Sequence, residues 1–233
     1  MNRAPVVIDY YSDLLCVWAY VAQVRVDEIQ QEFGEKVIIN HHFFSLFGDT
    51  TTRLEVGWKD RGGFSGFHDH VAAVCDQHPH CQLHPDVWKL GCQPASSAVP
   101  HLMIQAIQVL VADAVVDDQR DATGKTRVER IICAIRRAFF EQGKNIGQMA
   151  VLWEIIAQFD VPRSAVEQVL NDGRALARHA LQNEKRYSLQ LEGSPTFILD
   201  AGRQKLFGNV GYRVIQANIE QLLRDQPAHM SWC

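Results

Sequence analysis

The cysteine at position 16 is the residue of this chain best placed to do chemistry. It directly follows a strand-like stretch over residues 5–11 and directly precedes a helix-like stretch. A cysteine there lies at a helix N-terminus, where unpaired backbone N–H groups and the positive end of the helix dipole stabilise a thiolate. We therefore predict that Cys16 has a lowered pKa and acts as a nucleophile near neutral pH.

A proline near the C-terminus is the second candidate. The chain reads Gly-Ser-Pro-Thr-Phe over residues 193–197, so Pro195 comes just before a short strand of β-branched and aromatic residues. A cis bond between Ser194 and Pro195 would turn the preceding peptide outward, where its backbone groups can pair with an extended substrate. Trp18 is expected either to line the entrance to the thiol or to pack in the core.

The order of these elements resembles the thioredoxin fold. The stretch 193–197, a hairpin at Ala201-Gly202 and the run 206–209 before a last helix make the chain similar to the DsbA-like branch of that fold. The resemblance covers the whole chain and implies an α/β fold with a large all-helical insertion. It implies a thioredoxin-like domain formed by residues 1–47 and 190–233, and an inserted helical domain over residues 48–189.

The chain departs from this family at the cysteine motif. DsbA-like oxidoreductases carry Cys-Pro-x-Cys, whereas residues 16–19 here read Cys-Val-Trp-Ala. A dithiol cycle within the motif cannot operate, because the second cysteine is missing. A sister group, the kappa-class glutathione transferases and 2-hydroxychromene-2-carboxylate isomerases, is similar in overall plan but carries Ser-Pro-Tyr in this place. The chain matches neither motif completely.

Three functions are compatible with this pattern. The first is a DsbA-like thiol-disulfide oxidoreductase in which Cys16 forms a mixed disulfide that an external thiol such as glutathione resolves. The second is a glutathione-dependent isomerase or transferase, in which Cys16 replaces the serine of the sister group and orients the glutathione sulfur. The third is a non-catalytic module that keeps the fold and the peptide-binding proline. We favour the first, with glutathione as co-substrate and no tightly bound cofactor.

Histidines crowd the segment from residue 68 to residue 84 and raise the question of a metal site. The spacing argues against one, because Pro79 and Pro85 exclude a helical pair at His80 and His84, and the segment contains no Cys-x-x-Cys. We therefore predict no metal.

The chain contains six cysteines. Cys75, Cys81 and Cys92 belong to the segment predicted to be inserted, so each is a candidate to resolve a mixed disulfide at Cys16. A disulfide needs a Cα separation of about 4.4 to 6.8 Å, which a sequence cannot establish. The identity of the resolving thiol therefore stays open at this point.

Composition limits the partners. The net charge is −4 over 233 residues and no basic stripe is present, which argues against nucleic acid or an anionic membrane surface. No stretch approaches about 18 uninterrupted apolar residues, as a membrane span would need. Met1 leads into a strand without a secretory signal pattern, which predicts a cytoplasmic protein. A homodimer stays open.

Periodicity and capping signals predict the main elements. A helix is expected from Cys16 to Gly34, followed by a strand over 37–44 that is parallel to the first through a right-handed crossover. Residues 48–93 are expected to be loop-rich with short helical pieces. Two Ser/Thr-x-x-Glu capping boxes predict helix starts, one at Thr126 and one at Ser164.

Overall fold

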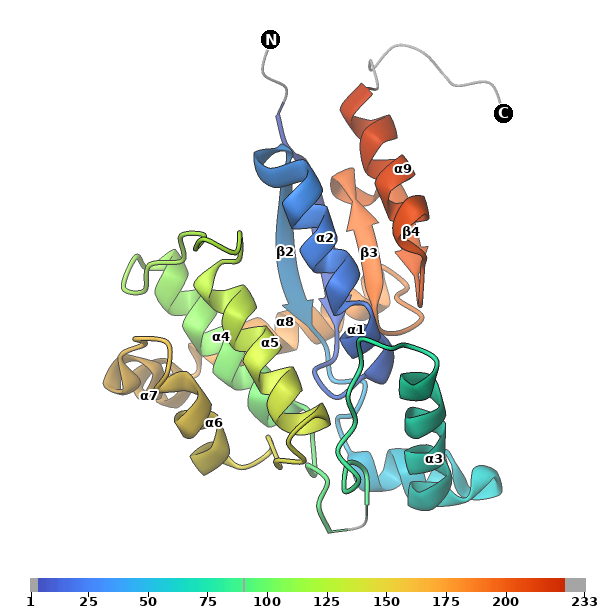
Figure 1. Cartoon of the computed structure of the whole chain (residues 1–233). Coiled ribbons are helices and arrows are strands. Elements are labelled where there is room, and N and C mark those ends of the chain that lie inside the picture. The colour runs from blue at the N-terminus through green and yellow to red at the C-terminus, as the bar shows by residue number, and fades with distance from the viewer. Residues whose placement is uncertain (1–3, 90, 225–233) are drawn as a thin grey trace.

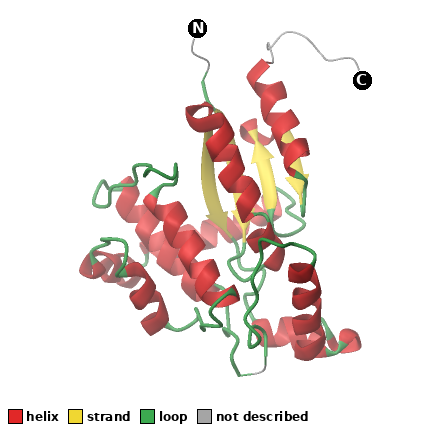
Figure 2. Cartoon of the chain, viewed as in Figure 1, coloured by secondary structure: helices red, strands yellow, loops and turns green. Residues whose placement is uncertain are grey.

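A four-stranded mixed sheet forms the centre of the protein (Figures 1 and 2). The structure is a computed structural model that describes residues 4–89 and 91–224. The strand order is β2-β1-β3-β4. Strand β1 (Val6–Ser12) runs parallel to β2 (Val37–Phe43) and antiparallel to β3 (Thr196–Leu199), which forms a hairpin with β4 (Gln204–Phe207). The N-terminal and C-terminal parts of the chain thus share one sheet.

Two helices cover one face of this sheet, α2 (Gln23–Phe33) and α9 (Tyr212–Arg224) (Figure 1). Ile29 of α2 and Ile219 of α9 are fully buried in the same apolar cluster as Ile8 of β1. Burying each of these side chains contributes about 1.5–3 kcal/mol, so the cluster fixes both helices against the sheet.

The chain between β2 and β3 is mainly helical. It supplies α3 (Gly63–Asp76), α4 (Ala98–Ala112), α5 (Arg127–Phe140), α6 (Met149–Ile156), α7 (Arg163–Asn171) and α8 (Arg174–Ser188). Shorter helical turns span Thr52–Val56 and Lys59–Arg61 in this region, and Gly34–Lys36 and Asp200–Gly202 outside it. Figure 1 shows α8 crossing behind the sheet, where it contacts β2. This is the α/β architecture with inserted helices that the sequence predicts.

The helix expected from Cys16 to Gly34 is interrupted at Ala22, which corrects the prediction. A short helix, α1 (Val17–Val21), precedes the break and α2 follows it. The Val21 carbonyl leaves the helical ladder and accepts a hydrogen bond from His80 Nε2 at 3.1 Å. A side chain inserted into the ladder is a known cause of helix kinks.

The prediction that residues 48–93 are loop-rich was wrong for α3, which has 14 residues. The buried residues Phe67, Val71, Val74 and Cys75 have the spacing of a helix face. Glycines and histidines around them diluted this pattern in the sequence.

The two predicted capping boxes had different outcomes. At Thr126 both reciprocal hydrogen bonds with Glu129 are present, and α5 begins there. At Ser164 the prediction was wrong, because the N-cap of α7 is Pro162, two residues earlier, and no side chain caps the helix.

Candidate active site

Cys16 lies in the turn between β1 and α1, at the N-cap of a helix of five residues. Its N–H donates to the carbonyl of Asp13 at 3.2 Å, and its own carbonyl accepts from the N–H groups of Ala19 and Tyr20 at 3.1 Å. The residue is only 5% exposed. The end of the strand and the start of the helix thus fix the direction in which the thiol points.

The loop before β3 lies against this turn. The peptide bond between Ser194 and Pro195 is cis, and both residues are buried. The Cys16 thiol donates to the Ser194 carbonyl, with an Sγ···O distance of 3.2 Å. The Ser194 hydroxyl oxygen accepts from Asp13 N–H at 3.0 Å. Two loops that are far apart in the sequence therefore form one unit at the end of the sheet.

A cavity of about 270 Å³ opens beside Cys16. Trp18 and Ser194 also line it, so the structure brings these three candidates together, whereas Pro195 is buried behind the wall. The remaining lining residues are Val17, Leu46, Phe47, Arg53, Trp58, Phe67, His70, Glu192, Gly193 and Phe207. The wall is therefore largely aromatic, with two basic side chains and one acidic one.

The pKa of the Cys16 thiol is raised, which corrects the sequence-based prediction of an acidic thiol. Burial is the main cause, because a buried thiolate loses its hydration. Hydrogen bonds to the sulfur from the Ser194 side chain and from the backbone at Ala19 and Trp18 lower the pKa, but burial outweighs them. Cys16 in the free protein is therefore a neutral thiol at pH 7.

A buried carboxylate, Asp13, lies next to the thiol-bearing turn. Its Oδ1 accepts from Leu15 N–H at 2.8 Å, and its Oδ2 accepts from Phe47 N–H at 3.0 Å and from the Ser97 hydroxyl at 2.7 Å. Burial raises the pKa of Asp13, but the charge of His101, 3.6 Å from Oδ1, and these hydrogen bonds outweigh burial and leave the pKa lowered. One ionised side chain thus connects three separate segments behind the cavity.

Arg53 is a basic residue of the cavity wall that sequence reasoning missed. It comes from the helical turn Thr52–Val56, and its Cζ lies 4.7 Å from the centroid of the Phe47 ring. The buried Nε has no hydrogen-bond partner among the described residues. Burial lowers the pKa of Arg53, and the negative charges of Asp13 and of a Cys16 thiolate oppose this lowering. The guanidinium is therefore close enough to interact with charge at the sulfur.

His70 is the second basic residue of the wall and was also missed. It is on α3, and its ring lies 6.4 Å from that of Trp18 and 5.2 Å from that of Trp58. Burial, and then the positive charge of Arg61, lower the pKa of His70. The imidazole is therefore neutral at pH 7 and can accept a proton. No local motif marks either His70 or Arg53.

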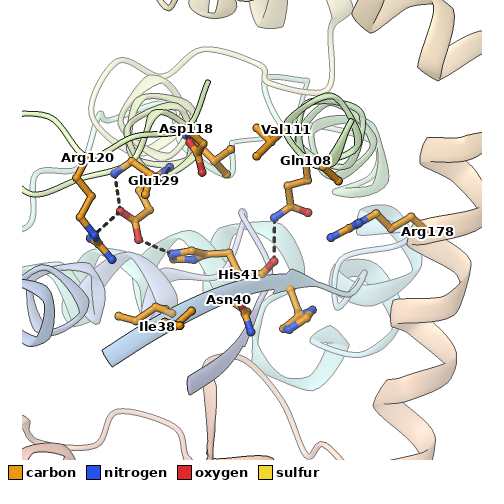
Figure 3. A pocket seen from close by; sticks show the side chains of 14 residues that line it. Ile38, Asn40, His41, Gln108, Val111, Asp118, Arg120, Glu129 and Arg178 are labelled. Carbon is orange, nitrogen blue, oxygen red and sulfur yellow. Dashed lines mark hydrogen bonds and ion pairs between the residues drawn. The ribbon is translucent and has the colours of Figure 1, made fainter. Parts of the chain in front are cut away.

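A larger cavity of about 530 Å³ lies along β2, between α4 and α5 (Figure 3). One of its carboxylates is paired: Glu129 lies 3.6 Å from His41 Nε2 and 3.8 Å from Arg120. Gln108 donates to the His41 carbonyl at 3.0 Å. No cysteine lines this cavity. The Cys16 cavity is therefore the better candidate for thiol chemistry.

The other predictions for this region concern metal, further cysteines and membrane. Within residues 4–89 and 91–224, no group of three or more His, Cys, Asp or Glu side chains could hold a metal ion. Cys75, Cys81 and Cys92 carry free thiols, and none of them lines the Cys16 cavity. Among the described helices, none has both the length and the apolar character that crossing a bilayer requires.

The chain matches no protein-family model and no curated protein. Solved structures are similar to it. A probable DsbA oxidoreductase from Streptomyces coelicolor has a TM-score of 0.67 and 18% identity, covering 97% of this chain and 94% of that one. The cytosolic disulfide reductase DsbM from Pseudomonas aeruginosa with GSH has a TM-score of 0.63 and 20% identity, covering 94% and 99%. The chain has the DsbA-like thioredoxin fold.

A 2-hydroxychromene-2-carboxylate isomerase shares this DsbA-like fold with the chain. Its TM-score is 0.61 at 15% identity, covering 94% of this chain and 96% of that one. The resemblance stated from the sequence is thereby confirmed, together with the fold class. At such low identities the likeness establishes the fold, and the chemistry depends on the residues of the Cys16 cavity.

Proposed function

We propose that the protein is a cytoplasmic thiol-disulfide oxidoreductase in which Cys16 is the single nucleophile and glutathione or another small thiol resolves the mixed disulfide. The observation that carries the proposal is the Cys16 thiol at the wall of a 270 Å³ cavity, 3.2 Å from the carbonyl that precedes a cis-proline. No other described cysteine lines the cavity. The resolving thiol therefore enters from outside. The cytosolic reductase among the similar structures supports the proposed location.

Exchange at a single cysteine takes two balanced steps. In the first, the Cys16 thiolate attacks one sulfur of a disulfide R–S–S–R′, so that a Cys16–S–S–R bond forms and R′–S⁻ leaves. In the second, a glutathione thiolate attacks the R sulfur and releases the Cys16 thiolate together with glutathione–S–S–R. Each step replaces one S–S bond by another, so the cycle needs no further oxidant or reductant.

Cys16 has to lose its proton before the first step, because its pKa is raised. We assign the role of proton acceptor to His70, which lines the same cavity and whose lowered pKa keeps it neutral. Arg53 places a positive charge near the sulfur and so favours the thiolate once it forms. The thiol is therefore activated within the cavity when the substrate binds, and not by the helix end alone.

The cavity suits a thiol that carries both positive and negative charge. Arg53 matches a carboxylate, and Glu192 matches an ammonium group. Glutathione has both groups. The Ser194 N–H has no partner among the described residues and is free to donate to the backbone of a bound peptide. The DsbM structure that contains GSH supports this choice of partner.

A second function, a glutathione-dependent isomerase or transferase, is favoured by one observation. The neutral Cys16 thiol acts as a hydrogen-bond donor, as the serine of the sister group could. In this role Cys16 would donate to the sulfur of bound glutathione and would form no disulfide. The isomerase among the similar structures supports keeping this alternative.

Incubation with oxidised glutathione, followed by intact mass measurement, tests the proposal. We expect an adduct at Cys16 that reduced glutathione removes, and we expect the Cys16→Ser variant to lack it. Cys133→Ser is the matched control, because Cys133 is outside the cavity. Turnover of an electrophile with glutathione that survives Cys16→Ser would favour the isomerase or transferase. A protein inert in both assays would be a binding module, and the oxidoreductase proposal would be wrong.

A further inference from the structure

A second group of thiols lies where α3 ends. Cys75 is in the last turn of α3, and Cys81 is in the loop that follows. Two successive turns fold this loop back: His78 N–H donates to the Cys75 carbonyl at 2.9 Å, and Cys81 N–H donates to the His78 carbonyl at 2.8 Å. The two thiols share a hydrogen bond, and both are free. The backbone therefore holds the two sulfurs side by side.

The loop between the two cysteines is held firmly. His78 Nδ1 donates to the Val74 carbonyl at 2.7 Å, and His80 Nε2 donates to the Val21 carbonyl of α1 at 3.1 Å. Cys75 is 5% exposed, whereas Cys81 is partly accessible. Figure 1 shows the chain passing from α3 towards α1. One thiol of the pair can thus meet a small molecule while its neighbour is shielded.

We propose that Cys75 and Cys81 are a second redox couple of this protein and close to a reversible intramolecular disulfide without the participation of Cys16. A disulfide needs the sulfurs to approach to about 2.05 Å. Two thiols that already share a hydrogen bond reach that distance by side-chain rotation and a small shift of the loop. Neither thiol lines the Cys16 cavity, so the two sites act separately.

The oxidant is a small-molecule disulfide such as oxidised glutathione. The accessible Cys81 sulfur, as thiolate, attacks one glutathione sulfur; a mixed disulfide forms and one glutathione thiolate leaves. The Cys75 thiolate then attacks Cys81 Sγ, the intramolecular disulfide forms and the second glutathione thiolate leaves. The two cysteines lose two electrons and two protons, which convert one oxidised glutathione into two reduced ones. In the reduced pair the shared hydrogen bond lowers the pKa of Cys75 and raises that of Cys81, so Cys81 must lose its proton before the first attack.

The sequence offers a clean test. Trypsin cleaves after Arg61 and Lys89, and no lysine or arginine lies between them, so one peptide over residues 62–89 contains both cysteines and no other. The wild-type protein is equilibrated in glutathione buffers from reduced to oxidised, quenched in acid, alkylated and digested. We expect this peptide to carry two alkyl groups in reduced buffer. In oxidised buffer we expect it to carry none and to be about 2 Da lighter than the unmodified dithiol.

Three variants sharpen the test. Cys75→Ser should stop at a single glutathione adduct on Cys81, and Cys81→Ser should remove the lighter peptide. Cys16→Ser should form the lighter peptide at the same glutathione ratio as the wild type, which separates this proposal from the proposed function of Cys16. Cys92, exposed and without a neighbouring thiol in the described residues, serves as the lone-cysteine control. Two alkyl groups or two glutathione adducts on the wild-type peptide at every ratio would overturn the proposal.

Discussion

The two thiol sites of this protein differ in the group that each sulfur contacts. Cys16 is the one cysteine among the described residues that lines its cavity, and it donates to a carbonyl, whereas Cys75 and Cys81 share a hydrogen bond. A lone thiol that reacts with a disulfide stops at a mixed disulfide, because no second sulfur is within reach. A thiol with a neighbour continues to an internal disulfide. Both sites are largely buried, so burial does not distinguish them. The group next to each cysteine, a carbonyl or a second thiol, decides whether a mixed or an internal disulfide forms.

The largest expected effect comes from removing the lone sulfur. Cys16→Ser should lower the rate of glutathione-dependent disulfide exchange by about 10³-fold or more, because no other described cysteine lines the cavity. Steady-state reduction of a small disulfide measures this rate. Cys81→Ser is the control and should retain most of the exchange activity. Equal losses in the two variants would contradict the proposal that the two thiol sites act separately.

The next effect concerns stability. Asp13→Asn should lower the free energy of unfolding by about 3 kcal/mol, because Asp13 is a buried acceptor paired with His101. Urea denaturation measures the change. The lowered pKa of Asp13 adds stability that is present above its unfolded pKa of about 3.9 and is lost as the pH falls through the folded pKa.

Asp86→Asn is the matched control for that measurement. Asp86 forms an exposed ion pair with Lys89, so its loss should leave the free energy of unfolding almost unchanged. Asp13 contacts the Cys16 turn and not the Cys75–Cys81 loop, so Asp13→Asn should leave the disulfide of the peptide 62–89 intact. A loss of both thiol reactions in a folded Asp13→Asn protein would contradict the separation of the two sites.

A smaller effect is expected at the charged wall of the cavity. Arg53→Gln should raise the KM for oxidised glutathione by about 10- to 100-fold, because a charged partner of the substrate carboxylate is lost. Hydroxyethyl disulfide, which has no charge, should be affected little. Arg53→Lys keeps the charge and should recover part of the loss. An equal rise for both disulfides would show that Arg53 has a structural role only.

The smallest expected difference is in the pH dependence of the two sites. The raised pKa of Cys16 predicts that its alkylation rate still increases above pH ~8.5, the ordinary thiol value. The lowered pKa of Cys75 predicts that labelling of this residue levels off at a lower pH, whereas the raised pKa of Cys81 predicts that labelling of Cys81 does not. Residue-resolved labelling with iodoacetamide measures both profiles. A plateau for Cys16 below pH 8 would show an acidic thiol and would restore the helix-end activation predicted from the sequence.

Features marked by their sequence neighbours could be predicted from the sequence. The individual strands, the position of Cys16 after a strand and the helix start at Thr126 depend on residues only a few positions away. The same local pattern at Ser164 failed, because Pro162, two residues earlier, is the N-cap, and the φ that its ring fixes already suits a helix start. The proline and the capping box each predict a helix start, and the sequence pattern does not show which of the two the helix uses.

The chemistry of the cavity could not be predicted in this way. The direction of the Cys16 pKa shift is set by burial, and that burial depends in part on Ser194, 178 residues further along the chain. Arg53 and His70 reach the cavity through the packing of a segment whose periodicity was weak. The sequence predicts the helix N-terminus at Cys16, but it does not predict how deeply the surrounding residues bury the thiol.

The bond between Asp13 N–H and Ser194 Oγ joins residues 181 positions apart. During synthesis, about four fifths of the chain must therefore leave the ribosome before the loop at Ser194 can pack against the Cys16 turn. Until then Cys16 lacks its carbonyl acceptor at Ser194, although most of the aromatic side chains of the cavity wall have already been synthesised. The reactive centre is thus among the last features that the folding chain can complete.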